Sequence, residues 1–325
     1  MASDSGLRED TTDAKGFLGS FVGKLMCGTV RSKAFMDIKD IEEEDIQEAY
    51  KKVPPAFKRK ELLSDMYKMD FPRRGIAVVI NNKNFSPEME KKGYGVRTGT
   101  DVDATRICSR LKMLGFEVDR YHDATCKQMK MAFSGAAAKD HSDADCFVGV
   151  ILSHGEKDKV FGTDGPVDTN DIFQYFKGYS CKSLAGKPKI FFIQACRGHQ
   201  LDEGVNMNVA DAKPFQYEAK AEEEEEIRIP NEADFIVSYS TVPGYYSWRN
   251  SANGSWYVQA LVHILDKYGT TMELQKLLTQ LNKMVAYTDK FMSNTLQTNP
   301  SMHGMKQIPS FTSMLTKDLY FVPKK

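Results

Sequence analysis

A cysteine and a histidine each follow a run of apolar residues, a position from which a side chain can do chemistry in an α/β protein. Cys196 follows Ile190–Ile193 within the sequence QACRG, and His154 follows Phe147–Leu152 within SHG. The carboxyl ends of neighbouring parallel strands lie at one edge of a sheet, where such proteins build their sites. If these two runs are neighbouring strands, a thiol and an imidazole meet there as a nucleophile and its acid/base partner.

The residues around this pair favour acyl transfer over metal or cofactor chemistry. Gly155 permits close backbone approach, and its N–H together with that of Cys196 is suited to stabilising an oxyanion. Cys196 and His199 have the spacing of a zinc ligand pair, but no second pair completes a site, so no metal is expected. No glycine-rich phosphate loop is present, and no cofactor is expected. The other cysteines are interpreted as small apolar residues: Cys27, Cys108, Cys126, Cys146 and Cys181.

The composition is that of an ordinary globular protein. The chain has 325 residues, 41% of them apolar, with 44 basic and 44 acidic side chains. Zero net charge gives no field for binding nucleic acid, and the longest apolar runs are far below the roughly 18 residues that span a membrane. The polar, acidic start lacks the pattern of a secretory signal, and six scattered cysteines suggest a reducing compartment. We therefore expect a cytoplasmic protein that binds neither nucleic acid nor membranes.

Apolar runs alternate with helical periodicity from Arg74 onward, which predicts an α/β fold. Continuous apolar runs are typical of parallel strands that are covered on both faces. The expected strands are Ile76–Ile80, Phe116–Tyr121, Cys146–Leu152, Ile190–Ile193, Phe235–Tyr239, Phe311–Leu315 and Leu319–Val322. The expected helices run from about Asp101 to Gly115, over Cys126–Ala138, and over two amphipathic segments after Tyr239, the second containing Leu274–Val285.

Two polar segments interrupt or precede this pattern. Residues 1–65 form a polar leader with one helix candidate, Ile41–Val53, which the Pro54-Pro55 pair would end. Residues 199–230, with the acidic run Glu222–Glu226, are interpreted as a linker between a larger N-terminal and a smaller C-terminal part.

The combination of QACRG with the upstream SHG resembles the caspase family, and the match extends over most of the chain. Further matching segments are NNKNF at 81–85, RTGTDVD at 97–103, FGTDGP at 161–166 and GYYSWRN at 244–250. The similarity runs from about Tyr67 to Val322. It implies a caspase-like fold with about six mostly parallel strands flanked by helices on both faces. Asp164 departs from the family, whose members often have Asn there.

This resemblance implies a cysteine endopeptidase that cuts proteins after Asp. Guanidinium groups suit such a substrate because they bind both oxygens of a carboxylate. A strand of the enzyme would hold the substrate backbone through Ser247 and Arg249. For Trp256, at the expected start of a helix, core packing is nearly as good an interpretation. The implied pocket residues are Arg97, Gln194 and Arg249, and the residues lining neighbouring subsites are Tyr246, Trp248 and Trp256.

The resemblance also implies a zymogen that is activated by cleavage. Cuts are expected after Asp13 and Asp211, with Asp202 a weaker candidate, giving a propeptide 1–13, a large subunit 14–211 and a small subunit 212–325. The short leader suggests an executioner caspase of apoptosis that is cleaved by an upstream initiator protease and controlled by inhibitor proteins. Its substrates would be proteins with exposed Asp-containing loops. A homodimer of subunit pairs is expected to form at the terminal strands, 311–322.

Two alternatives remain. Related cysteine proteases share the His-Gly and Ala-Cys elements but cut after Asn, Arg or Lys; Arg97 and Arg249 argue against this, because they would repel a basic side chain. An inactive homologue acting as a decoy or scaffold is the other alternative, and the intact Cys196 and His154 argue against it.

Overall fold

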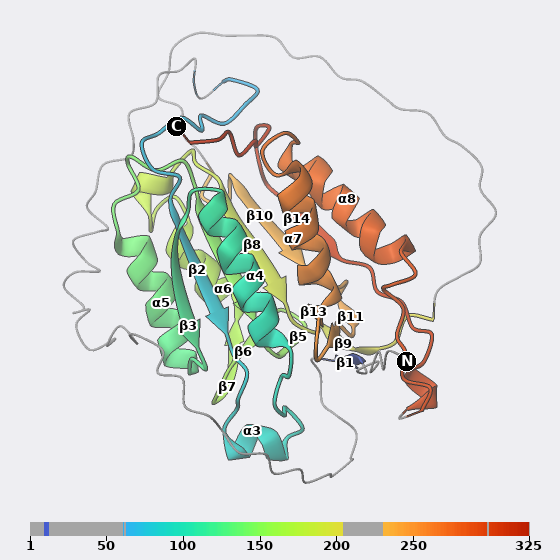
Figure 1. Cartoon of the computed structure of the whole chain (residues 1–325). Coiled ribbons are helices and arrows are strands. Elements are labelled where there is room, and N and C mark those ends of the chain that lie inside the picture. Colours follow the sequence, from blue (N-terminus) through green and yellow to red (C-terminus); the bar gives the residue numbers. More distant parts are fainter. Residues whose placement is uncertain (1–9, 13–60, 62, 204–229, 298, 325) are drawn as a thin grey trace.

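The computed structural model describes residues 10–12, 61, 63–203, 230–297 and 299–324. Its centre is a six-stranded sheet in the order β14-β10-β8-β4-β2-β3 (Figure 1). Five strands are parallel, and β14 pairs antiparallel with β10. The strands are β2 (Ile76–Asn81), β3 (Glu117–His122), β4 (Phe147–Leu152), β8 (Lys189–Gln194), β10 (Phe235–Tyr239) and β14 (Ser310–Ser313). The predicted fold class is confirmed.

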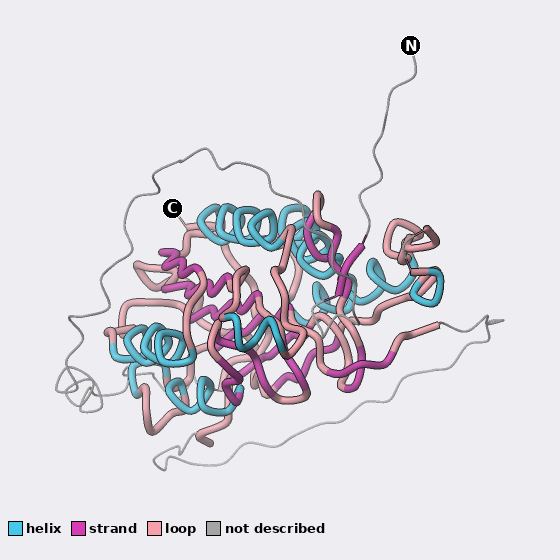
Figure 2. Tube along the Cα trace, turned by 90° about the horizontal axis from the view of Figure 1, so that it is seen from below, coloured by secondary structure: helices cyan, strands magenta, loops and turns pink. Residues whose placement is uncertain are grey.

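Helices cover both faces of this sheet. One core cluster joins the sheet to α4, α7 and α8, and a second joins its other face to α5 and α6. Figure 2 shows the strands between these helical layers. The helices are α3 (Pro87–Lys91), α4 (Thr100–Met113), α5 (Cys126–Ala138), α6 (Thr169–Phe173), α7 (Trp256–Tyr268) and α8 (Leu274–Tyr287), with short 3₁₀ turns at Gln174–Phe176, Lys182–Leu184 and Pro300–Met302.

The continuous apolar runs form the strands that are buried on both faces. Every residue of β2, β4 and β8 is buried, and successive side chains belong to opposite core clusters, as Val79 and Ile80 do. Gly149 in β4 leaves room for the aromatic core, since a Cβ there would lie 2.5 Å from the ring of Phe191. The pattern that predicted parallel strands therefore reflects packing from both sides.

Asp164, where the sequence departs from the family pattern, lies at the start of α5. Its Oδ1 accepts a hydrogen bond of 2.7 Å from the backbone N–H of Cys126, the first residue of that helix. Burial would raise the pKa of Asp164, but the hydrogen bonds from Cys126 outweigh it and the pKa is lowered. The carboxylate thus caps a helix N-terminus, where negative charge is favourable.

Short strands gather at the edge where the parallel strands end, at the bottom of Figure 1. They form three small sheets: β5-β6-β7, β11-β9 and β1-β12-β13. Their bounds are β1 (Asp10–Thr12), β5 (Gly155–Glu156), β6 (Lys159–Gly162), β7 (Gly165–Asp168), β9 (Gly198–Gln200), β11 (Gly244–Tyr245), β12 (Trp248–Asn250) and β13 (Gly254–Ser255).

One expected strand is wrong, and other expectations lie outside the described residues. Residues 319–322 form no strand: Leu319 and Phe321 are buried, but the carbonyl of Leu319 accepts the N–H of Leu274 at the start of α8. Their alternation reflects burial against helices. The helix expected at Ile41–Val53 and most of the linker lie outside the described residues, among which no helix is long and apolar enough to cross a membrane.

Candidate active site

The segments that carry His154 and Cys196 lie side by side at the carboxyl edge of the sheet. Strands β4 and β8 are parallel neighbours, and the N–H of Ser153 donates to the carbonyl of Gln194 at 3.1 Å. A Cβ at Gly155 would lie 2.8 Å from the carbonyl oxygen of Cys196, so only glycine permits this approach. The strand adjacency expected from the sequence is present.

The imidazole of His154 is held by a backbone carbonyl and two aromatic rings. Its Nε2 donates a hydrogen bond of 2.7 Å to the carbonyl of Gly95. Because a carbonyl can only accept, Nε2 carries the proton, and Nδ1 is the nitrogen that can take one up. The rings of Phe85 and Tyr94 pack on the imidazole with centroid distances of 4.6 and 5.5 Å. Sequence reasoning missed Gly95, since a main-chain carbonyl gives no signal in residue types.

The thiol of Cys196 is buried and accepts a hydrogen bond of 3.1 Å from the backbone N–H of Ser247. Burial raises its pKa to about 12, although this hydrogen bond and the charge of Arg97 act in the opposite direction. Burial, and then Arg97, lower the pKa of His154 to about 3. The resting pair is therefore a neutral thiol and a neutral imidazole at pH 7.

This protonation state predicts how Cys196 reacts with iodoacetamide. Only the thiolate reacts, so the rate should rise about tenfold per pH unit between pH 6 and 8 without a plateau. Peptide mass spectrometry of the Cys196 fragment, with Cys196→Ala as the blank, measures this rate separately from the other cysteines. A rate that is constant over this range would mean a preformed thiolate and would contradict the assignment.

Arg97 lies in the loop between α3 and α4, two residues after the Gly95 that holds His154. Its guanidinium Nη1 donates to the carbonyl of Asn82 and to Thr100 Oγ1, each at 2.9 Å. The side chain is fully buried, which lowers the pKa of Arg97 to about 10. Since Arg97 acts electrostatically on both His154 and Cys196, a fixed positive charge lies beside the pair.

Arg249 and Gln194 reach the same place from two other elements. Arg249, in β12, donates from Nε to the carbonyl of Thr98 at 2.7 Å, the residue next to Arg97. Gln194, the last residue of β8, donates from Nε2 to Ser247 Oγ at 2.7 Å. Both side chains are buried, and burial lowers the pKa of Arg249 to about 9. Arg249 thus contacts the residue next to Arg97, and Gln194 contacts the residue whose backbone N–H donates to Cys196 Sγ.

The aromatic residues expected in the subsites differ in their surroundings. Tyr246 is partly buried, and burial and then the charge of Cys196 raise its pKa, which indicates proximity to the thiol. Trp248 and Trp256 stack with ring centroids 5.6 Å apart, and both belong to the core cluster on the α4, α7 and α8 face. Trp256 begins α7, and it also lines a cavity of about 350 Å³.

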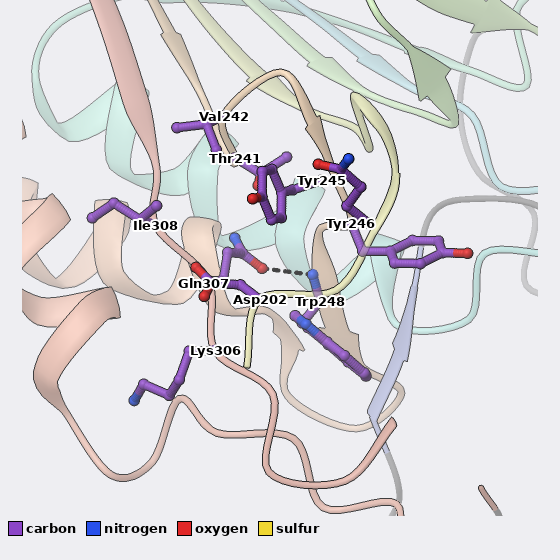
Figure 3. Close-up of a pocket in the computed structure, with 10 residues that line it drawn as sticks. Asp202, Thr241, Val242, Tyr245, Tyr246, Trp248, Lys306, Gln307 and Ile308 are labelled. Carbon is purple, nitrogen blue, oxygen red and sulfur yellow. Dashed lines mark hydrogen bonds between the residues drawn. The ribbon is translucent and has the colours of Figure 1, made fainter. Parts of the chain in front are cut away.

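Tyr246 and Trp248 also line a second pocket (Figure 3). The N–H of Trp248 donates to Gln307 Oε1 at 2.6 Å, which ties β12 to the C-terminal segment. The pocket is lined by Gln200, Asp202, Thr241, Val242, Tyr245, Tyr246, Trp248, Lys306, Gln307 and Ile308.

The expected processing sites Asp13 and Asp211 lie outside the described residues, whereas Asp202 lies in a bridge with Lys306. Within the described part of the chain, no three His, Cys, Asp or Glu side chains are placed to hold a metal ion.

Comparison with known proteins identifies the family. The caspase domain model matches residues 74–320. The chain is 40% identical to caspase-7 of Gallus gallus over 322 residues, covering 98% of this chain and 95% of that protein. It is 44% identical to caspase-3 of Bos taurus over 259 residues, covering 80% and 88%. The crystal structure of caspase-1 from Spodoptera frugiperda superposes with a TM-score of 0.73 at 36% identity, covering 83% of this chain and 97% of that one.

The chain belongs to the caspase family. It is a cysteine-type endopeptidase that cleaves proteins after Asp, and it falls in the executioner group of apoptotic caspases. Nothing in these relatives favours an inactive decoy. Zymogen synthesis and dimeric assembly are typical of the family.

Proposed function

We propose that Cys196 is the nucleophile and His154 the acid/base residue of this peptidase. The observation that carries the proposal is the contact between the two segments at the ends of β4 and β8. The thiol sulfur attacks the carbonyl carbon of the substrate Asp while its proton passes to His154 Nδ1. The imidazolium then protonates the leaving amine, and a thioester remains on Cys196.

The second half of the reaction uses the same groups. His154 Nδ1 takes a proton from water, whose oxygen attacks the thioester carbonyl, and the thiolate leaves and regains that proton from the imidazolium. The N–H groups of Gly155 and Cys196 would stabilise the oxyanion in both steps. Both steps need an imidazole that is protonated on Nε2 and free to accept a proton on Nδ1. The hydrogen bond from Nε2 to the Gly95 carbonyl favours this tautomer.

The specificity pocket would consist of Arg97, Arg249 and Gln194. Two buried guanidinium groups favour a carboxylate over an amide or an ammonium group, because Coulomb interactions are strong where water is excluded. Ser247 and Arg249 would hold the substrate backbone along β12, with Tyr246, Trp248 and Trp256 lining the neighbouring subsites. Support comes from the hydrogen bonds that link Arg249 to Thr98 and Gln194 to Ser247.

A panel of fluorogenic tetrapeptides that differ only in the last residue tests this pocket. The Asp peptide should be cleaved about 10³-fold more efficiently than the Asn, Arg and Lys peptides, because only Asp matches the charge of the pocket. A comparable kcat/KM for the Asn peptide would contradict the assignment of the two arginines.

We further propose that the chain matures by cuts after Asp13 and Asp211, leaving subunits 14–211 and 212–325. Both sites lie in polar sequence, where proteolysis is favoured. Mass spectrometry of the fully active enzyme should give fragments that begin at Ala14 and Ala212. An active preparation with an intact Asp211–Ala212 bond would contradict this, and Asp211→Ala should prevent that cut.

We also propose how the enzyme is activated, controlled and assembled in the cell. An upstream initiator protease would make the activating cut, inhibitor proteins would control the mature enzyme, and the cytoplasm would be its compartment. The antiparallel strand β14 is at the edge of the sheet, which supports dimer contact there between two copies.

A further inference from the structure

A short strand from the leader lies against the strand that we assign to substrate binding. Residues Asp10–Thr12 form β1, which pairs antiparallel with β12. In the register, Asp10 lies opposite Asn250, Thr11 opposite Arg249, and Thr12 opposite Trp248. β1 therefore adds a third strand to β12 and β13, at the lower right of Figure 1. An extended peptide that adds a strand in this way is a common mode of peptide recognition.

The direction of this strand leads toward the nucleophile. In an antiparallel pair, each residue forward along one strand is opposite one residue backward along the other. Thr12, the last residue of β1, is therefore opposite Trp248, and the residue before Trp248 is Ser247, whose backbone N–H donates a hydrogen bond of 3.1 Å to Cys196 Sγ. Ser247 Oγ also accepts the side chain of Gln194 from the proposed pocket. The register thus leads along the substrate strand to the reacting sulfur.

The sequence of the segment suits this position. It reads Asp-Thr-Thr-Asp over residues 10–13, so the residue that follows the strand is Asp, after which this enzyme cleaves. Threonine is β-branched and favours extended backbone. At the other end of the strand, Asn250 borders the cavity of about 350 Å³, which Asn253 and Gln259 also line. Amide groups there can donate hydrogen bonds to a carboxylate.

The covalent connection between β1 and the rest of the chain favours binding of β1 to β12. Residues 13–60 join β1 to the described part of the chain at Glu61, and about 3.3 Å per residue lets them reach across the molecule. A tethered segment docks in an intramolecular step, so its effective concentration does not fall when the protein is diluted, and even weak docking competes with dilute substrate.

We propose that the leader is an intramolecular pseudosubstrate: Asp10–Thr12 docks on β12 beside Cys196 and excludes protein substrates until the chain is cut after Asp13. This inference rests on the proposed function, because it uses the same Asp pocket and substrate strand. After the cut, the tether is lost, and peptide 1–13 dissociates as an ordinary weak product.

The test measures binding of a fluorescein-labelled Asp-Thr-Thr-Asp peptide with a free carboxyl end. Cys196→Ala prevents cleavage, and an inserted site for an unrelated protease between residues 204 and 229 lets the linker be cut in every sample. The chain with its leader should bind the probe about fivefold more weakly than the chain lacking residues 1–13. Equal Kd values would overturn the proposal.

Variants of the leader identify the cause of the difference. Thr11→Pro, which removes a backbone N–H from β1, should restore the Kd of the truncated chain. Asp13→Asn, which removes the carboxylate that the proposed Asp pocket would recognise, should do the same. Asp4→Asn, a matched change outside the strand, should keep the weaker binding. If Asp4→Asn also restores binding, the effect is one of leader charge and the pseudosubstrate assignment fails.

Two further readouts separate the possible failures. The ratio of the two Kd values, with and without residues 1–13, should be independent of protein concentration. A ratio that grows with concentration would mean that the leader of one copy binds to another copy, and this would overturn the intramolecular assignment. The proposed Asp pocket itself is wrong if the truncated chain does not bind the probe. It is also wrong if the truncated chain with Arg249→Lys binds the probe as tightly as the truncated chain with Arg249. Binding to the truncated chain that the leader does not weaken contradicts only the pseudosubstrate.

Discussion

Cys196→Ala should reduce hydrolysis of an Asp-containing peptide by about 10³-fold or more, to the limit of detection. The sulfur forms the bond to the substrate carbonyl in our mechanism, and alanine offers no atom that can replace it. The measurement is kcat/KM with a fluorogenic tetrapeptide on the processed enzyme. Since Cys196→Ala cannot process itself, the comparison requires a linker that is cut by an unrelated protease in both proteins.

Two matched variants make this loss specific. Cys108→Ala removes another buried thiol, on the apolar face of α4, and should leave kcat/KM within about twofold. His154→Ala should be nearly as inactive as Cys196→Ala, and the double variant no worse than either, because residues that act as a unit are not additive. Substantial activity in Cys196→Ala, with Cys108→Ala inactive, would contradict the assignment of the nucleophile.

Arg249→Lys should lower kcat/KM for an Asp substrate by about 10²-fold. Lysine keeps the positive charge but loses the planar fork that binds both carboxylate oxygens, and it loses the Nε hydrogen bond to Thr98. The preference for Asp over Asn should fall as well, since a flexible ammonium group discriminates less between them. Steady-state kinetics with the paired Asp and Asn peptides measure both effects.

The control for this prediction is Arg110→Lys, at an ion pair with the exposed Asp266, where charge is conserved and activity should not change. Thermal unfolding of each variant shows whether the buried Arg249→Lys chain remains folded at the assay temperature. A folded Arg249→Lys enzyme with unchanged preference for Asp would exclude Arg249 from the pocket.

The layered fold could be predicted because burial fixes the apolar pattern. Strands β2, β4 and β8 are covered on both faces, and their continuous apolar runs identify them in the sequence. The same reasoning failed at 319–322, where Leu319 and Phe321 alternate as in a strand but pack beside helices. Burial alone does not reveal where backbone hydrogen bonds go.

The site was predictable only in its side-chain chemistry. The strand ends and motifs identified Cys196 and His154, and Arg97 and Arg249 followed from the family resemblance. The carbonyl of Gly95, which orients the imidazole, belongs to the main chain and leaves no trace in residue types. The pairing of β1 with β12 joins segments more than 230 positions apart, and no local periodicity reports such a contact.

The central claim is that a thiol at residue 196 attacks the bond after an Asp that two guanidinium groups hold. Treatment of the processed enzyme with a tetrapeptide chloromethyl ketone ending in Asp, followed by peptide mass spectrometry, tests it most directly. We expect one adduct, on Cys196. Its formation should be about 10²-fold slower when the reagent ends in Asn instead of Asp, and also when the Asp reagent is used with the Arg249→Lys enzyme. An adduct on another cysteine, or equal rates for the Asp and Asn reagents, would contradict the account.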